Sequence, residues 1–209
     1  MDLIIITPEI NHPEESGSIS VFFSNGLSKL HLRKPFFTLS DYHDYISRID
    51  KKFHSRISIH SHFSLLNEFS GLGAHITSQV REEGRLPEII NLSEPSTIST
   101  SFHSWKEIET NQFVFDYVFI SPVFNSISKK GYNAAIDLSA IRQVKQIISF
   151  ENKKTPSIIA LGGVDANNIG LLQQNGFDGA AVLGAIWESK DPIASFMKIK
   201  ETITGFEYA

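Results

Sequence analysis

The chain has 209 residues, of which 41% are hydrophobic and 20% are charged, and its formal net charge is −4. This size and composition are typical of one globular domain with a substantial core, and the acidic balance gives no electrostatic reason to expect nucleic acid or an anionic membrane as a partner. The sequence contains no cysteine, which excludes disulfides, thiolate metal sites and cysteine nucleophiles.

The N-terminal segment is apolar but short, and it carries Asp2 where a secretory signal peptide would carry a basic residue. No segment of the sequence approaches the roughly 20 consecutive apolar residues that a membrane-spanning helix needs. We therefore expect a cytoplasmic protein that has neither a membrane nor a nucleic acid as its partner.

Short runs of β-branched and other apolar residues recur along the chain, and each run predicts a strand. We expect eight strands, at residues 3–7, 29–33, 56–60, 73–76, 97–102, 116–120, 157–161 and 179–183.

Helical patterns fill most of the gaps between these strands. The predicted helices cover residues 42–49, 62–69, 104–110, 136–149, 166–175 and 192 to about 204. Residues 79–96 contain Gly84, Pro87 and Pro95, so we expect only a short or irregular helix there.

Local signals mark the starts of several helices. Ser40 or Asp41 can cap the helix at 42–49, and Asp165 can cap the helix at 166–175. Ser104 and Glu107 have the spacing of a capping box.

Alternating strands and helices imply parallel strands joined by right-handed crossovers. Eight such units favour closure of the sheet into a barrel. The sequence therefore predicts the α/β class and a single (β/α)₈ TIM barrel over residues 1–209, without a linker or a second domain.

The last two predicted strands both end in glycine, at Gly162-Gly163 and at Gly184. In (β/α)₈ barrels the backbone N–H groups after strands seven and eight often bind phosphate, and glycine allows the ligand to approach them closely. We therefore expect Gly162, Gly163, Leu183 and Gly184 to bind a phosphate. The alternative is that these glycines serve tight packing alone.

Four histidines lie at or just after predicted strand ends, where barrel enzymes carry their functional groups: His31, His60, His75 and His103. A single histidine at such a position is more often a hydrogen-bonded packing residue, but four of them at one end of the barrel favour a functional role for the group. A metal site is not favoured, because no aspartate or glutamate lies at the ends of the second to fifth strands.

Arg33 ends the second predicted strand, where its charge can neutralise a phosphate or a carboxylate; the alternative is a solvated surface arginine. The loop at 121–131 is long and rich in hydroxyl groups and lysines. Ser126, Ser128 and Lys129 in this loop are candidates to close over an anionic ligand, and the alternative is a solvated loop with no such role.

The chain resembles the thiamine phosphate synthase/TenI superfamily over nearly its whole length. The matching pieces are His31-Leu-Arg33, the segment from Ser101 to Glu107, the segment from Asp116 to Phe124 with Lys129-Lys-Gly131, and the two glycine-ending strands. The resemblance implies a TIM barrel that acts on a small phosphorylated thiazole in thiamine biosynthesis.

The resemblance to true synthases is incomplete. These share a Gln-x-Arg-x-Lys second strand and two aspartates for magnesium, whereas this chain has His31 and Pro35 at the glutamine and lysine positions, with Lys34 one residue out of register. His60-Ser61 replaces an Asn-Asp pair, and the second aspartate position falls near Val80. A hard divalent cation usually needs carboxylate ligands, so these losses argue against magnesium-assisted departure of pyrophosphate.

TenI-type proteins match better, because they also have a His-hydrophobic-Arg second strand and lack the aspartate pair. In that branch the resemblance implies thiazole tautomerisation, with His103 as the catalytic acid/base and with neither metal nor cofactor. A 1,3-proton shift needs one group that titrates near neutrality. Synthases also have a histidine in this segment, so His103 does not separate the two branches.

Three functions therefore stay open. The first is a thiazole tautomerase, the second is a divergent thiamine phosphate synthase that would use magnesium, and the third is a non-catalytic regulator that binds a thiazole or thiamine phosphate. A homo-oligomer also stays open. In the tautomerase the residues expected to bind the substrate are His31, Arg33, Ser126, Ser128, Lys129, Gly162, Gly163, Leu183 and Gly184.

Overall fold

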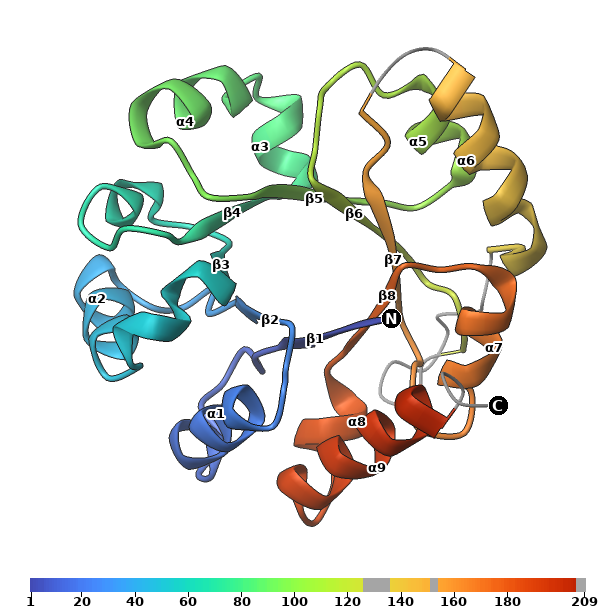
Figure 1. The fold of residues 1–209 in the computed structure, drawn as a ribbon. Helices are drawn as coiled ribbons and strands as arrows, with labels where there is room; N and C mark the ends of the chain where they lie inside the picture. Colours follow the sequence, from blue (N-terminus) through green and yellow to red (C-terminus); the bar gives the residue numbers. More distant parts are fainter. Residues whose placement is uncertain (126–135, 151–153, 206–209) are drawn as a thin grey trace.

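Eight parallel strands close into a barrel, and the helices lie outside them (Figure 1). The computed structural model describes residues 1–125, 136–150 and 154–205, apart from the side chains of residues 92 and 93. Each strand pairs with the next one along the chain, and β8 pairs with β1. The predicted (β/α)₈ TIM barrel is confirmed. Its strands are β1 (Asp2–Ile6), β2 (Lys29–Leu32), β3 (Ile57–Ile59), β4 (Gly73–Ile76), β5 (Ile98–Phe102), β6 (Tyr117–Ile120), β7 (Ser157–Leu161) and β8 (Gly179–Val182).

Helices and short 3₁₀ segments connect the strands. The 3₁₀ segments are η1 (Lys51–Arg56), η2 (Phe63–Leu66) and η3 (Leu138–Ala140). Within the described residues the α-helices are α1 (Glu15–Ser24), α2 (Leu39–Ser47), α3 (Ser78–Glu82), α4 (Leu86–Ser93), α5 (Trp105–Thr110), α6 (Ile141–Phe150), α7 (Ile169–Asn175), α8 (Gly184–Trp187) and α9 (Pro192–Gly205). No helix in this part of the chain has the length and apolar character needed to cross a membrane.

Strand residues alternate between the outside and the inside of the barrel, as the period of a strand requires. Outward residues such as Leu30, Ile57 and Ala74 belong to the large core between strands and helices. Inside the barrel, β1, β6, β7 and β8 contribute a second apolar cluster that contains Ile4, Ile6, Tyr117, Phe119, Ile159 and Ala181.

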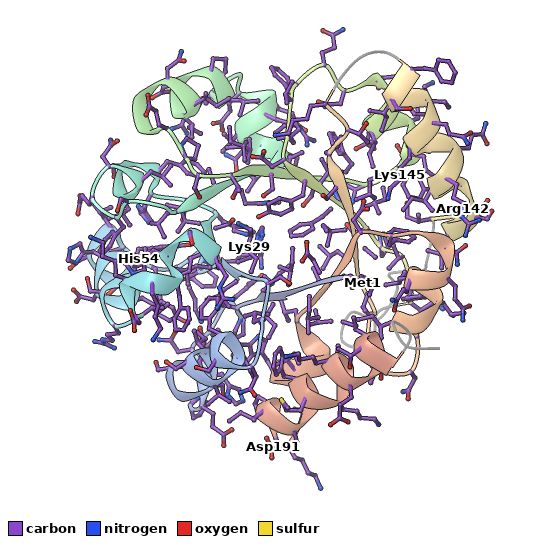
Figure 2. All side chains as sticks on the ribbon, viewed as in Figure 1. Met1, Lys29, His54, Arg142, Lys145 and Asp191 are labelled. Atoms are coloured by element: carbon purple, nitrogen blue, oxygen red, sulfur yellow. The ribbon has the colours of Figure 1, made fainter. Side chains whose placement is uncertain are left out.

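The interior positions of β2 to β5 are mostly polar instead. His31, Ser58, His75 and Ser99 alternate with the outward residues of these strands, and all four side chains are buried. Lys29 also lies within the ring of strands, whereas His54, Arg142 and Asp191 lie outside it (Figure 2). The barrel interior therefore has an apolar half and a polar half.

Two helix starts differ from the prediction. Helix α2 begins at Leu39 because Thr38, rather than Ser40 or Asp41, is its N-cap, and Thr38 and Asp41 form a reciprocal capping box. Helix α7 begins at Ile169 rather than at residue 166, because Asp165 accepts the N–H groups of the next residues in a turn that precedes the helix. The cap of α5 is confirmed, since Ser104 accepts the Glu107 N–H.

The sequence patterns missed helix α1 and overstated the segment at 62–69. Helix α1 contains Gly17 and several serines, which are poor helix formers, but Ile19, Phe22 and Phe23 are buried on one side of it. Only Phe63–Leu66 is helical in the second segment, as a 3₁₀ turn. Residues 79–96 form two short helices, α3 and α4, in agreement with the expected irregularity.

Candidate functional site

A cavity of about 620 Å³ opens at the carboxyl ends of β7 and β8, and we call it the first cavity. The predicted phosphate-binding residues line it together with Arg33: Gly162, Gly163, Leu183 and Gly184. Glu188, the C-cap of α8, also lines it, together with Ser195 and Lys198 of α9, and the sequence patterns did not single out these three residues. The one feature of the sequence that points to these residues is that they come after Gly184, the glycine that follows β8.

The glycines of the first cavity have different structural roles. Gly162 and Gly163 have φ angles of +100° and +66°, a region that side chains rarely adopt. A Cβ atom at Gly163 would lie 2.5 Å from the Asn125 carbonyl oxygen, so packing against the preceding loop also requires glycine there. Gly184 is not under that constraint, and a Cβ atom there would first meet the Glu188 carboxylate, at 3.2 Å. Tight packing therefore explains the glycines after β7, and the binding of a phosphate by the backbone at this end of the barrel stays a prediction.

Arg33 lies between the first cavity and a second one. Its backbone N–H donates to the Thr7 hydroxyl at 2.9 Å, and its half-exposed guanidinium forms an ion pair with Glu9. It lines both cavities, of which the second measures about 960 Å³ and also includes His60 and Ser61 in its wall. Arg33 thus lines both cavities, and its contact with an anionic ligand stays a prediction.

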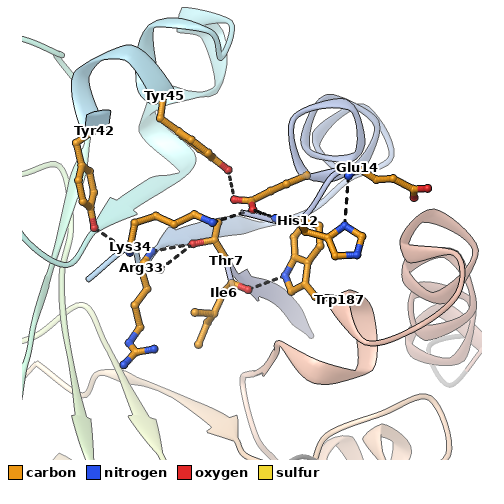
Figure 3. Close-up of polar contacts among 10 residues, drawn as sticks. Ile6, Thr7, His12, Glu14, Arg33, Lys34, Tyr42, Tyr45 and Trp187 are labelled. Atoms are coloured by element: carbon orange, nitrogen blue, oxygen red, sulfur yellow. Dashed lines mark hydrogen bonds and ion pairs between the residues drawn. The ribbon is translucent and has the colours of Figure 1, made fainter. Parts of the chain in front are cut away.

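Lys34 is directed away from this site. Its side chain is fully buried and donates to the Glu15 carboxylate at 2.8 Å, and the Tyr45 hydroxyl donates to the same carboxylate (Figure 3). Burial lowers the pKa of Lys34, and the bond to Glu15 opposes that shift. Lys34 therefore links the end of β2 to α1 and α2. It does not replace the anion-binding lysine that true synthases have one residue further along the chain.

Three of the four predicted histidines meet inside the barrel, and we call His31, His60 and His75 the histidine cluster. His31 Nδ1 and His60 Nε2 are 2.9 Å apart, and the rings of His60 and His75 stack with centroids 4.3 Å apart. His31 and His75 are buried and do not line the first cavity, so the predicted contact between His31 and a substrate stays a prediction.

Serine and tyrosine hydroxyls form hydrogen bonds with the histidine cluster. His31 Nε2 lies 2.7 Å from the Tyr117 hydroxyl, which also bonds Ser58, and His75 Nδ1 lies 2.9 Å from the Ser99 hydroxyl. The sequence patterns missed Tyr117. The signal that identifies it is strand alternation, because Tyr117 shares the inward face of β6 with Phe119.

Burial keeps the histidine cluster neutral. It lowers the pKa of His31 and of His60 well below 6.5, and the neighbouring His75 lowers both further. For His75, burial first and then the charges of Arg81 and Arg33 lower the pKa to about 3. These three rings are therefore poor general acids near neutral pH.

His103 is separate from the cluster. It follows β5 directly, is exposed, and its Nδ1 lies 3.1 Å from the Ser121 carbonyl oxygen. Because a carbonyl oxygen only accepts, Nδ1 carries the proton and the neutral ring has its lone pair on Nε2. Ser121 lines the first cavity, whereas His103 is not among the lining residues, so His103 lies next to the cavity through its contact with Ser121. The remaining predicted residues, Ser126, Ser128 and Lys129, lie outside the described residues.

The residues at the ends of β3 and β4 do not fit a magnesium site. Among the described residues that line the second cavity, the carboxylates are Glu83 and Glu88, and each lies 3.6 Å from the Arg85 guanidinium. His60 and Ser61, which directly follow β3, also line this cavity and offer an imidazole and a hydroxyl. Magnesium prefers carboxylate, phosphate and water oxygens in an octahedron, and this set of groups does not supply them.

Comparisons with known proteins agree with this architecture. A thiamine phosphate pyrophosphorylase from Bacteroides thetaiotaomicron is 30% identical in sequence, with a TM-score of 0.74 and with 98% of each chain covered. A second structure of that name, from Pyrococcus furiosus, has a TM-score of 0.77 at 16% identity and covers 98% of this chain and 96% of its own. The second likeness shows the fold alone.

Sequence relatives carry the same kind of name. The thiamine-phosphate synthase of Desulfitobacterium hafniense is 25% identical over 183 residues, which cover 85% of this chain and 84% of the relative. The family model described as thiamine monophosphate synthase matches residues 5–186. The chain therefore belongs to the thiamine monophosphate synthase/TenI family, whose members share this barrel.

Proposed function

We propose that this protein binds a thiazole phosphate in the first cavity and acts as a thiazole tautomerase in thiamine biosynthesis. The observation that supports the proposal is the hydrogen bond from His103 Nδ1 to the Ser121 carbonyl, because Ser121 lines the same cavity as Gly162 and Gly184, and this bond leaves the lone pair on Nε2. A proton shift needs such a group and no metal.

The phosphate is expected to accept bonds from backbone N–H groups after β7 and β8. Each such bond to an anion is charge-assisted, and Arg33 and Lys198 supply positive charge to the same cavity. The thiazole ring would then extend toward Ser121 and His103. Arg33 is close enough to both cavities to meet the carboxylate of the substrate.

In the reaction, His103 Nε2 takes a proton from one carbon of the non-aromatic thiazole tautomer. The electron pair of that C–H bond forms a ring double bond, and the double bonds shift along the conjugated system. The double bond at its far end opens, and the carbon there takes the proton back from the same nitrogen. The Ser121 carbonyl keeps the ring oriented and stabilises the imidazolium that forms, because Nδ1–H donates to it throughout.

A second candidate is thiamine phosphate synthase, which the names of the relatives favour. The described residues at the ends of β3 and β4 do not supply a fitting magnesium site, and this counts against it. A non-catalytic thiazole phosphate binder is the third reading.

One set of incubations separates the three readings. The purified protein is given the thiazole carboxylate phosphate tautomer, and formation of the aromatic product is followed by ultraviolet absorption and NMR. In parallel it is given the aminopyrimidine pyrophosphate and the aromatic thiazole phosphate, with and without magnesium. Aromatisation without thiamine phosphate formation is the expected result. Magnesium-dependent thiamine phosphate would establish the second candidate, and binding without either product would establish the third.

A further inference from the structure

The histidine cluster is a set of nitrogen donors that the proposed reaction does not use. One ring nitrogen from each of His31, His60 and His75 lies within 4.8 Å of the other two. The three side chains come from β2, from the residue after β3 and from β4, which are neighbouring strands of the closed barrel. We propose that the cluster binds one divalent transition-metal ion of the zinc class through three imidazoles.

The spacing of the nitrogens is close to that of a metal site. Zinc–nitrogen bonds of about 2.0–2.1 Å in tetrahedral geometry put ligand nitrogens about 3.4 Å apart. The 2.9 Å between His31 Nδ1 and His60 Nε2 is shorter than this, and the 4.8 Å limit of the whole group is longer. Two lone pairs do not face each other at 2.9 Å without a proton or a cation between them. A metal ion takes the place of that proton, His60 carries its proton on Nδ1 instead of Nε2, and the ion draws the third nitrogen in.

The outer contacts are those that orient metal-binding histidines. If His31 Nε2–H donates to Tyr117 and His75 Nδ1–H donates to Ser99, then His31 Nδ1 keeps its lone pair for an ion. His75 Nε2 lies 3.2 Å from the Ser101 hydroxyl, which donates to it in this tautomer, so an ion would replace that hydrogen bond. The Tyr117 hydroxyl in turn bonds Ser58 at 2.8 Å. Branched apolar side chains usually fill this part of a TIM barrel, so three oriented imidazoles here are an unusual use of interior space.

The donor set also selects the metal. Imidazole nitrogens suit zinc, cobalt, nickel and copper, whereas magnesium and calcium prefer oxygen. His60 lines the second cavity, which leaves a fourth position open to solvent. The charged side chains that act on the cluster are the cations Lys29, Arg33 and Arg81, so the fourth ligand is expected to be water, hydroxide or an anionic group of a ligand. This ion is additional to the proposed tautomerase reaction and does not depend on it.

Cobalt is the direct probe of this site. The full chain is prepared without a histidine tag, treated with a chelator and titrated with Co²⁺ while its visible absorption is recorded. We expect saturation at one Co²⁺ per chain with the intense spectrum of a four-coordinate site, and full displacement by Zn²⁺. Mg²⁺ should neither bind nor compete. A lack of saturable binding, or a weak six-coordinate spectrum, would overturn the proposal.

Variants show whether the bound ion is in the cluster. His60→Asn removes the least buried ligand and should weaken Co²⁺ binding at least 100-fold, whereas Tyr117→Phe keeps all ligands and should weaken it 10- to 100-fold through loss of the His31 contact. The matched control is His43→Asn, because His43 is a half-exposed surface histidine. Thermal melts confirm that each variant is folded. Wild-type affinity in the folded His60→Asn and Tyr117→Phe proteins, or an equal loss in His43→Asn, would refute binding at the cluster.

Discussion

Arg33 and Lys34 are adjacent cations with opposite environments. Side chains alternate at the end of β2, so Arg33 shares the direction of the inward His31 and reaches the cavities, whereas Lys34 follows the outward Leu32 toward α1. Burial of Lys34 is compensated by the Glu15 carboxylate at 2.8 Å. The alternation of the strand, rather than the residue type, decides which cation is available to a ligand.

Lys34→Met should destabilise the fold by about 3–5 kcal/mol, because it leaves the buried Glu15 carboxylate without its cation. Urea unfolding followed by circular dichroism measures the loss. Lys34→Met combined with Glu15→Gln should recover part of it, since no unpaired charge then remains. Lys52→Met, at an exposed ion pair with Asp50, is the control and should leave the midpoint unchanged. A Lys34→Met protein as stable as the control would show that the buried pair does not stabilise the fold.

His103→Asn should lower kcat of the tautomerase by about 10²- to 10⁴-fold, while the affinity for the thiazole phosphate stays nearly unchanged. Asparagine can still donate to the Ser121 carbonyl, but it cannot take up the substrate proton. Steady-state kinetics and calorimetry measure the two effects, and His62→Gln serves as the control, since His62 instead contacts the Phe37 carbonyl. A rate within a few-fold of wild type, together with a lower melting temperature, would assign His103 to structure alone.

At the scale of elements, the turns after β7 and β8 define the expected phosphate site. The first turn is fixed by its own packing, since a side chain at Gly163 would meet the backbone of Phe124 and Asn125. Substitution there changes stability and ligand binding together. The start of α8 is more tolerant, because the three atoms nearest to a Cβ at Gly184 all belong to the flexible end of Glu188. Gly184 is therefore the better position for testing the phosphate site.

Gly184→Ala should weaken the phosphorylated thiazole about 10-fold or more and leave the unphosphorylated thiazole unaffected. The added methyl group impedes approach of the phosphate to the backbone N–H groups, each of which is expected to contribute about 1.5–3 kcal/mol. Calorimetry with both ligands measures the difference. Gly17→Ala is the matched control, because no atom lies within 4 Å of the added Cβ. Equal affinities of the wild-type protein for the two ligands would exclude a phosphate site here.

The elements also show which helices local sequence can predict. Helix α5 was predicted well because Ser104 and Glu107 form its cap within a few residues of each other. Helix α1 was missed because its serines and glycine oppose helix formation locally, and only the burial of Ile19 and Phe22 against the barrel stabilises it.

At the scale of the whole molecule, the barrel has an interior that is apolar on one side and polar on the other. The apolar half supplies ordinary core packing. The polar half places three neutral imidazoles in the interior, where burial and the nearby charges of Arg33 and Arg81 oppose protonation. The buried histidine cluster therefore makes the free energy of unfolding sensitive to acid.

The metal-free protein should lose stability as the pH falls below about 6.5. The folded pKa of His75 is about 3 and those of His31 and His60 are also well below 6.5, so the unfolded chain binds protons first. Each neutral histidine then costs up to about 1.4 kcal/mol of unfolding free energy per pH unit below 6.5. For His75 this loss extends down to about pH 3.

Urea unfolding at pH 7.5, 6.5 and 5.5 in the presence of a chelator, conditions chosen to bracket the ordinary histidine pKa, measures this dependence. His75→Gln, if folded, should flatten the slope, whereas the surface variant His43→Asn should retain it. A free energy of unfolding that does not change between pH 7.5 and 5.5 would show that the buried histidines take up protons as readily as free ones.

The sequence by itself determined the barrel, the glycines after its last two strands and the strand-end positions of the histidines, because these follow from patterns that repeat every few residues. Only the tertiary structure decided which of these residues meet. His31, His60 and His75 converge with Tyr117 because closure of the barrel brings strand ends together across the interior. It also buried Lys34 against Glu15 and left His103 next to the first cavity. Contacts between residues far apart in sequence depend on strand register and closure, and neither is encoded by any single segment of the chain.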